Sequence, residues 1–258
     1  MVEARDLKIT LRGVASVGTE FTLECSHFLA APGTLTCIIG LNGSGKSTLL
    51  RILYGKETPQ EGTIHIDSKP LKELTKRQIR RMVAWIEPGD TDQMVRSLRV
   101  QDHVAAALRL AGGRLPLLHR SLDVRNALSV AKLPSWLVDS VSAISQKRVG
   151  ELSSGQKQAV RLALCFLQHK RIIFADESTS NLDLRSAVDF FNSLKVSTAE
   201  VGTTAVVVTH DLSLAAKFAQ TVYLVRDHNV APFDTAPFPG INDKIEAFRS
   251  ALLGHNRQ

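Results

Sequence analysis

One short segment constrains this chain more than any other. Residues 40–47 read Gly-Leu-Asn-Gly-Ser-Gly-Lys-Ser and match the pattern G-x-x-x-x-G-K-[ST]. The apolar, β-branched run 34–39 precedes them and predicts a buried strand, and the leucines in 46–54 predict a helix. Between the two, the glycines let the backbone curl until several N–H groups face one point. Those donors and the positive helix end favour a bound phosphate.

The loop also carries the side chains that a nucleoside triphosphate and its metal ion require. We expect Lys46 to reach the β- and γ-phosphates and to take part in catalysis. The hydroxyl of Ser47 is expected to bind Mg²⁺. The predicted nucleotide-binding residues of this segment are Gly40, Asn42, Gly43, Ser44, Gly45, Lys46, Ser47 and Thr48.

Two further strand-like runs end in polar residues. Asp176 and Glu177 follow the apolar run 171–175, and His210 follows the β-branched run 206–209. At the carboxyl ends of parallel strands such side chains point into the ligand crevice. We therefore expect Asp176 to hold Mg²⁺ through its water shell and Glu177 to orient or deprotonate the attacking water. His210 is expected to donate a hydrogen bond to the γ-phosphate and is counted with Glu177 as catalytic.

Strand-like and helix-like runs alternate along the chain, which predicts an α/β fold with a sheet of mostly parallel strands. Residues 91–131 break this alternation because alanine and leucine dominate there and favour helices. We therefore expect one domain over 1–258 with an inserted α-helical subdomain over about 91–160. A RecA-like core is expected over about 1–90 and 160–230, followed by a tail over 231–258.

Composition limits where the chain can reside and what it can bind. No apolar run approaches the ~20 residues needed to span a bilayer, and the first ten residues mix charges of both signs. We therefore expect a soluble, cytosolic chain. Its three scattered cysteines fit buried hydrophobes in a reducing compartment. The net charge is +7, and its densest basic cluster, 76–81, is interpreted as a solvated helix face, with a basic face near a membrane partner as the alternative.

Five sequence segments occur together and in a particular order in this chain. By these segments and their order, the chain resembles the nucleotide-binding subunits of ABC transporters. They are the loop at 40–47, Leu152-Ser153-Ser154-Gly155-Gln156, the acid pair 176–177, Ser180-Asn181-Leu182-Asp183, and His210. The second segment resembles the ABC signature LSGGQ, which kinases and GTPases lack. The resemblance covers about residues 5–230 and implies a P-loop NTPase core with an antiparallel N-terminal β part. Residues 211–217 look most like the ATPases of siderophore, haem and cobalamin importers.

The resemblance implies a head-to-tail homodimer or heterodimer of ATPase subunits that sandwiches two ATP molecules with Mg²⁺. In it, Ser153 and Gly155 of one subunit would contact the γ-phosphate held by the other. Gln156 is a further nucleotide-binding residue, and Asp183 would bind nucleotide across the interface. The helix starting near Ser154 would aim its dipole at that phosphate. Integral membrane permease subunits are the expected partners, at the cytoplasmic face of the cell membrane, and no nucleic acid is expected.

The sequence departs from the family pattern in the segments that would touch the nucleotide. Glu87 lies 41 positions after Lys46, where the family carries a glutamine that binds Mg²⁺ or water. We name it as a metal ligand, with Gln93 as a substitute. Its carboxylate would add negative charge near the γ-phosphate.

Three other departures stand beside it. The aromatic that usually stacks on adenine is missing near Val17, so either stacking is lost or Phe21 supplies it. Ser154 replaces the first glycine of the signature, and Ser178 replaces the proline after the acid pair. Together with Glu87 they leave open a regulatory subunit that binds ATP but hydrolyses it slowly.

Another alternative is an ABC protein of translation or DNA maintenance. Translation-type members usually carry two cassettes, whereas this chain has one. DNA-maintenance proteins place a long coiled coil between the two motifs, whereas Leu152 follows Lys46 by only 106 positions without a heptad repeat. Both features favour transport.

Overall fold

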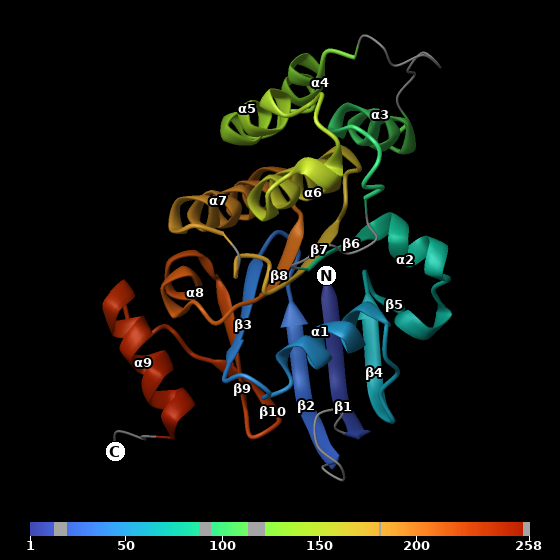
Figure 1. The fold of residues 1–258 in the computed structure, drawn as a ribbon. Coiled ribbons are helices and arrows are strands. Elements are labelled where there is room, and N and C mark those ends of the chain that lie inside the picture. Colours follow the sequence, from blue (N-terminus) through green and yellow to red (C-terminus); the bar gives the residue numbers. More distant parts are fainter. Residues whose placement is uncertain (13–19, 88–93, 113–121, 181, 255–258) are drawn as a thin grey trace.

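The computed structural model describes residues 1–12, 20–87, 94–112, 122–180 and 182–254. The strands of this part are β1 (Val2–Arg12), β2 (Glu20–Ala30), β3 (Leu35–Gly40), β4 (Glu61–Ile66), β5 (Lys69–Pro70), β6 (Val83–Ile86), β7 (Ile172–Asp176), β8 (Thr204–Val208), β9 (Thr221–Arg226) and β10 (Asn229–Phe233). They form one sheet in the order β5-β4-β1-β2-β10-β9-β3-β8-β7-β6 (Figure 1).

The helices of the described residues surround this sheet. They are α1 (Lys46–Tyr54), α2 (Lys76–Met82), α3 (Val100–Leu110), α4 (Val124–Val130), α5 (Ser135–Ala143), α6 (Ser154–Leu167), α7 (Leu184–Val201), α8 (Leu212–Phe218) and α9 (Ile241–Leu253), with short 3₁₀ turns η1 (Leu71–Glu73) and η2 (Val149–Glu151).

One half of the sheet is parallel. Strands β9, β3, β8, β7 and β6 pair with their neighbours in the same direction. Every residue of β3, β7 and β8 is buried, as expected for parallel strands covered on both faces. All carboxyl ends of these strands therefore meet at one edge, which is where Gly40, Asp176 and His210 leave the sheet.

The other half is antiparallel. β1 pairs antiparallel with β2 and with β4, and β4 with β5. Along β1, Val2, Ala4, Leu7 and Ile9 are buried, whereas Arg5 and Asp6 are exposed, as expected for strands with one solvated face. A hairpin of β9 and β10 joins the halves, because β10 pairs parallel with β2. The predicted fold class, a mostly parallel core sheet with an antiparallel N-terminal part, is confirmed.

The alternation of side chains along the buried strands builds two apolar cores, one on each face. Cys37, Ile173 and Val207 pack with α6, α7 and α8. Their neighbours Ile38 and Phe174 pack on the opposite face with α1 and the antiparallel strands. The sheet is therefore the middle layer, and both helix layers position loops at its carboxyl edge.

A group of helices stands at one end of the molecule, where α3 and α5 pack against α6 and α4 against α5 (Figure 1). Their buried residues Val104, Leu128 and Leu137 belong to the same apolar cluster as Ile173 of the sheet. One apolar cluster thus extends from these helices into the sheet. The helical subdomain over about 91–160 therefore stays a prediction of how this single domain is divided.

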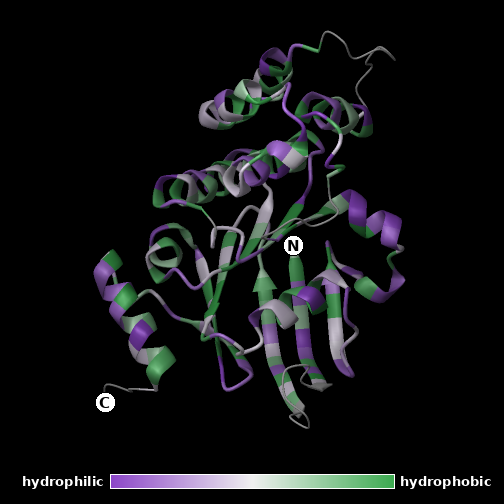
Figure 2. Ribbon diagram, viewed as in Figure 1, coloured by the Kyte–Doolittle hydropathy of each residue, from purple (hydrophilic) through white to green (hydrophobic). Residues whose placement is uncertain are grey.

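The basic cluster 76–81 forms α2, which begins at a capping box between Thr75 and Gln78. Only Ile79 of this helix is buried, and Figure 2 shows the helix as largely hydrophilic. Lys76, Arg77, Arg80 and Arg81 are exposed, as a solvated helix face requires, and the alternative of a basic face near a membrane partner stays a prediction.

The chain after Val230 is part of the fold. β10 continues across the expected boundary to Phe233, and α9 then packs against α8. Phe248 of α9 is fully buried, and its ring lies 5.1 Å from that of Phe233. The tail therefore covers part of the core. No helix in the described ranges is long and apolar enough to cross a bilayer.

Candidate nucleotide site

The loop between β3 and α1 has the backbone shape that its glycines predict. Gly43 and Gly45 adopt φ values of 78° and 109°, a region that other residues rarely occupy. A Cβ atom at Gly45 would lie 2.8 Å from a methyl carbon of Leu23 on β2. The backbone angle therefore favours glycine at this position, and any side chain here would also have to displace the Leu23 methyl group.

The helix that follows presents unused hydrogen-bond donors. α1 starts at Lys46, and no side chain caps its first turn. The N–H groups of an uncapped first turn point along the helix axis with the positive end of the dipole. The hydroxyl of Ser44 is buried and makes no hydrogen bond within the described residues. This arrangement fits an anion such as a phosphate.

Lys46 is buried, with 4% of its surface exposed, and it points back into the loop. Its Nζ donates to the carbonyls of Gly40 at 3.0 Å and Leu41 at 2.9 Å. Burial lowers the pKa of Lys46, and the nearby carboxylates of Glu177 and Asp176 oppose that shift. The ammonium is thus held beside the loop, and bound phosphates would supply further negative partners.

Ser47 and Asp176 meet although 129 residues separate them, because β7 and β3 flank β8. The Ser47 hydroxyl donates to Asp176 Oδ1 at 2.8 Å. Burial raises the pKa of Asp176; the Ser47 hydrogen bond opposes this shift, and the charge of Glu177 adds to it. A hydroxyl beside a carboxylate is the oxygen donor pair that suits Mg²⁺, which binds through one or two carboxylates and keeps waters and phosphate oxygens. The two residues therefore fit the predicted metal.

Glu177 stands on an unusual backbone. Its φ is 44°, in the left-handed region that non-glycine residues seldom adopt. Its N–H donates to the carbonyl of Val208 on β8 at 3.0 Å, and its side chain is half-buried. The acid pair is thus split, with Asp176 turned to Ser47 and Glu177 on the adjoining turn.

Glu87 follows β6, but its carboxylate has other partners. The indole of Trp85 donates to Glu87 Oε2 at 2.8 Å, and Lys56 Nζ lies 3.8 Å from the same oxygen. The charge of Glu87 still contributes to the raised pKa of Asp176. No three His, Cys, Asp or Glu side chains of the described residues cluster as metal ligands. A metal role for Glu87 stays a prediction, and its substitute Gln93 lies outside the described residues.

His210 is exposed and lies two residues beyond β8. β8 pairs with β3 on one side and with β7 on the other, so His210 shares the sheet edge with the loop and the acid pair. Asp211 caps α8 by accepting from the N–H groups of Ser213 and Leu214. The chain thus leaves the edge directly after His210.

The segment 152–156 lies at the start of α6. Ser153 and Gln156 form a reciprocal capping box, with N–H to side-chain oxygen distances of 3.2 and 3.3 Å. Ser153 and Ser154 are exposed. The Ser153 oxygen accepts from the N–H of Gln156, which leaves its O–H free to act as a donor as far as the described residues show. A Cβ atom at Gly155 would lie 3.4 Å from a methyl carbon of Leu182, which is ordinary van der Waals contact.

Asp183 caps α7 in a similar way. Its carboxylate accepts from the N–H of Ser186 at 2.9 Å and from its hydroxyl at 2.8 Å. These hydrogen bonds lower the pKa of Asp183, so the side chain is an anion at neutral pH. Asn181, the second residue of this segment, lies outside the described residues.

A ring pair beside the loop includes a residue that our sequence reading missed. Phe21 stacks on His228 with ring centroids 4.6 Å apart. His228 Nδ1 lies 3.1 Å from the carbonyl oxygen of Ser44, and the residue has a positive φ of 60° in the β9–β10 turn. Val17, near which the family carries its aromatic, lies outside the described residues. No local pattern marks His228, because it reaches the loop only through the pairing of β9 with β3.

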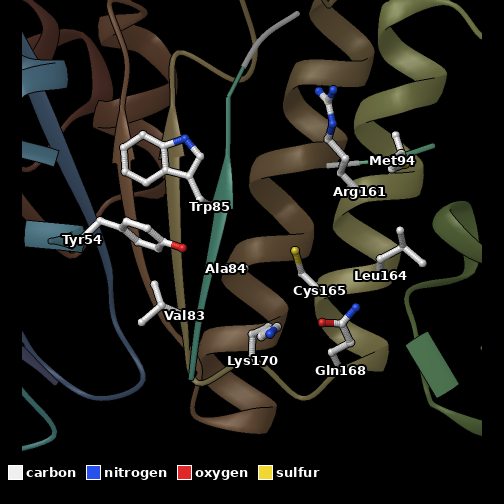
Figure 3. Close-up of a pocket in the computed structure, with 10 residues that line it drawn as sticks. All are labelled: Tyr54, Val83, Ala84, Trp85, Met94, Arg161, Leu164, Cys165, Gln168 and Lys170. Carbon is white, nitrogen blue, oxygen red and sulfur yellow. The ribbon is translucent and has the colours of Figure 1, made fainter. Parts of the chain in front are cut away.

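A hollow of about 230 Å³ lies at the edge strand β6. Figure 3 shows Tyr54 and Trp85 on one side of β6 and Arg161, Leu164 and Cys165 of α6 on the other. Trp85 is also covered by Lys56, whose Nζ lies 4.0 Å from the ring centroid. The hollow thus combines apolar side chains with the basic side chains of Arg161 and Lys170. Trp85, which lines it, lies two residues before Glu87 in the sequence.

Known proteins resemble this chain over most of its length. A family model described as ABC transporter matches residues 23–180. The hemin import ATP-binding protein HmuV of Bordetella parapertussis is 32% identical over 238 residues, which cover 89% of this chain and 84% of the relative. The methionine import ATP-binding protein MetN of Cutibacterium acnes is 33% identical over 80% of this chain and 54% of its own length.

Solved structures agree in fold. The dimeric cassette MJ0796 of a bacterial ABC transporter covers 89% of this chain and 96% of its own, with a TM-score of 0.67 at 23% identity. A putative metal-chelate type ABC transporter in an inward-facing conformation covers 98% of this chain and 88% of its own, with a TM-score of 0.68 at 20% identity. With the loop, the acid pair and the helix-capping Ser153 in place, the chain belongs to the ABC transporter family, as an ATP-hydrolysing ATP-binding subunit.

Proposed function

We propose that this chain powers import across a membrane by closing on ATP as a head-to-tail dimer. The observation that supports it best is the contrast between two half-sites of one chain. Lys46 and Asp176 are buried, and they bond to the loop carbonyls and to Ser47, whereas Ser153 is exposed at the N-cap of another helix. A second copy would bring its own Ser153 to the loop and complete the site.

Within the closed site, the roles follow from the geometry. Mg²⁺, once bound by Ser47 and Asp176, would supply charge neutralisation between the phosphates. Lys46 would exchange its loop carbonyls for phosphate oxygens, and Glu177 would orient or deprotonate the attacking water. His210 would donate to the γ-phosphate from the neighbouring strand end.

The partner's contribution comes from side chains that already cap helices. The partner's copy of Ser153 would donate its hydroxyl to the γ-phosphate while its oxygen still accepts from Gln156. Gly155 allows close approach, and the N-terminal dipole of α6 favours the same anion. Asp183, charged at neutral pH, would act across the interface.

Phe21 and His228 are proposed as the surface against which the base packs. The side chains of Phe21 and Leu23 point to the same face of β2, because they are two residues apart on a strand. Leu23 lies against Gly45 of the loop, so the Phe21 ring is on the loop side of the strand. An aromatic face beside a triphosphate loop suits a purine, because stacking needs only a flat apolar partner. This arrangement would replace the aromatic missing near Val17.

We propose permease subunits as the membrane partner and the cytoplasmic face of the membrane as the location. The named relatives are import ATP-binding proteins, and those for hemin match over the larger share of their length. Import of a haem-like metal chelate is therefore favoured. The hollow beside β6, with its apolar side chains and the basic groups Arg161 and Lys170, fits an acidic or amphipathic permease segment.

A complementation experiment tests the dimer. Lys46→Ala disables the loop, and Ser153→Asp keeps a good helix cap while placing a negative charge against the partner's phosphate. Each full-length variant alone should hydrolyse no ATP. In a mixture, some dimers join an intact loop to an intact Ser153, so part of the activity should return. If the mixture stays inactive while both variants fold, the head-to-tail arrangement is wrong.

A slowly hydrolysing regulatory subunit is the second candidate, and one observation favours it. The negative charge of Glu87 is close enough to contribute to the raised pKa of Asp176. Turnover of the purified chain with its membrane partner decides between the two, since rates ordinary for the family would exclude slow hydrolysis.

A further inference from the structure

Ser178, which follows the acid pair, has a role in this structure that the sequence did not suggest. Only 2% of its surface is exposed. Its hydroxyl donates to the carbonyl of Ile86 at 2.9 Å and makes a longer contact of 3.5 Å with the carbonyl of Asp176. Ile86 is the last residue of β6, so the hydroxyl ties the turn after β7 to the end of the neighbouring strand.

The turn tied down in this way contains the left-handed Glu177. Such a backbone costs free energy and persists only where the surroundings hold it. The N–H of Glu177 is anchored on β8 through Val208, and its carbonyl accepts from the N–H of Ser180 at 3.0 Å. Ser178 supplies the anchor on the opposite side, on β6. A proline biases the residue before it toward extended backbone, and serine at 178 does not impose this bias on Glu177.

The anchor point on β6 is itself fixed from a third direction. The carbonyl of Glu87, next to Ile86, accepts from Arg161 Nη1 at 3.1 Å and from Gln158 Nε2 at 3.4 Å. Both donors lie on α6 and are only 4% exposed. The end of β6 is therefore held by the helix that begins at Ser153, and Ser178 attaches the acid pair to that fixed point.

We propose that Ser178 is a positioning residue for ATP hydrolysis: its hydroxyl bond to Ile86 sets the direction in which Glu177 presents its carboxylate. The inference rests on the proposed role of Glu177 as the group that orients or deprotonates water. Ser178 itself touches neither nucleotide nor metal in this arrangement. Its loss should therefore slow the chemical step and leave nucleotide binding intact.

The first measurement is the single-turnover rate of ATP hydrolysis by full-length Ser178→Ala. Because a small displacement of a catalytic group is costly, we expect the rate to fall about tenfold or more at unchanged ATP affinity. Ser178→Thr, which keeps the hydroxyl, should retain most of the rate. If the alanine variant does not fold, Ser178→Cys, with its weaker donor, provides the comparison.

The matched control is Ser197→Ala. Ser197 lies on α7, away from the acid pair, and is also buried, with 6% of its surface exposed. Its hydroxyl donates to Thr203 Oγ1 at 2.9 Å. This variant loses the same kind of hydrogen bond and should show a lowered melting temperature at an unchanged hydrolysis rate. An equal loss of rate in both alanine variants would mean that Ser178 acts through general stability alone.

The second measurement places Ser178→Ala in a Glu177→Gln background. A residue that acts through Glu177 adds no further loss once the carboxylate is gone. A further loss of similar size, or a normal rate for Ser178→Ala alone, would overturn the positioning role. Normal hydrolysis by Glu177→Gln alone would instead overturn the proposed function of Glu177, so the two failures are distinguishable.

Discussion

The two half-sites of this chain differ in how far they are assembled. At the loop, Lys46 is buried and bonded to loop carbonyls, and Ser47 is bonded to the buried Asp176. At the other half-site, Ser153 and Asp183 are exposed, and each is bonded mainly to its own helix. From this comparison we predict that one chain suffices to bind the nucleotide, whereas hydrolysis requires two.

The charges of the two half-sites support the same division. The loop side holds a buried ammonium and two carboxylates, a balance that a triphosphate and Mg²⁺ would complete. The other half-site contributes the Ser153 hydroxyl and a helix N-terminus, which add donors without a full charge, and the exposed carboxylate of Asp183. We therefore expect the preformed, buried groups to determine affinity and the exposed ones to determine when the dimer closes.

The largest expected effect comes from a substitution on the loop side, and it tests whether that half-site alone binds the nucleotide. Lys46→Ala removes a charged donor from the phosphates and should lower ATP affinity about a hundredfold or more. Ser153→Asp, on the other side, should leave ATP affinity of the monomer unchanged while preventing ATP-induced dimerisation. Nucleotide titration and sedimentation of both variants measure the two quantities separately.

Two controls match these substitutions. Lys76→Ala removes a lysine from the exposed α2, and Ser135→Asp adds the same charge to the first turn of α5. Neither should change affinity or dimerisation. Weakened monomer binding by Ser153→Asp would show that the two half-sites are not independent.

The sequence predicted those elements whose structure is determined locally. The strand before the loop and the helix 46–54 occur within one residue of the expected bounds, because apolar β-branched runs and leucine spacing report burial directly. The helix expected to start near Ser154 runs from Ser154 to Leu167. Its start is specified by the capping box of Ser153 and Gln156.

Contacts between distant residues were not predictable in this way. The stacking of His228 on Phe21 depends on the pairing of β10 with β2, and the bond from Ser178 to Ile86 depends on the pairing of β6 with β7. α9 was missed because its sequence carries a weak pattern with one fully buried residue, Phe248. These features arise from topology, which no single window of sequence contains.

A smaller effect should sharpen the account of the loop side. Phe21→Leu keeps an apolar side chain but removes the ring, so base stacking of about 1 kcal/mol would be lost and ATP affinity should fall about fivefold. Affinity for tripolyphosphate should not change, because it has no base. Phe238→Leu, the same change in the half-buried tail, is the control. Equal losses for ATP and tripolyphosphate would mean that Phe21 supports the loop and does not contact the base.

The smallest expected effect concerns Glu87, which could act either in the nucleotide site or beside the hollow at β6. Its charge reaches Asp176, yet its carboxylate is bonded to Trp85 and faces Lys56. Glu87→Gln keeps an acceptor for the indole and removes one negative charge from a site that receives a polyanion. ATP affinity without Mg²⁺ should rise about threefold, since the repulsion of a partly solvated charge is modest. If Glu87 slows hydrolysis, the single-turnover rate with Mg²⁺ should rise as well, whereas the exposed Glu73→Gln should change neither quantity. An unaltered affinity for Glu87→Gln would mean that Lys56 already neutralises the carboxylate, and Glu87 would then belong to the hollow beside β6 and not to the nucleotide site.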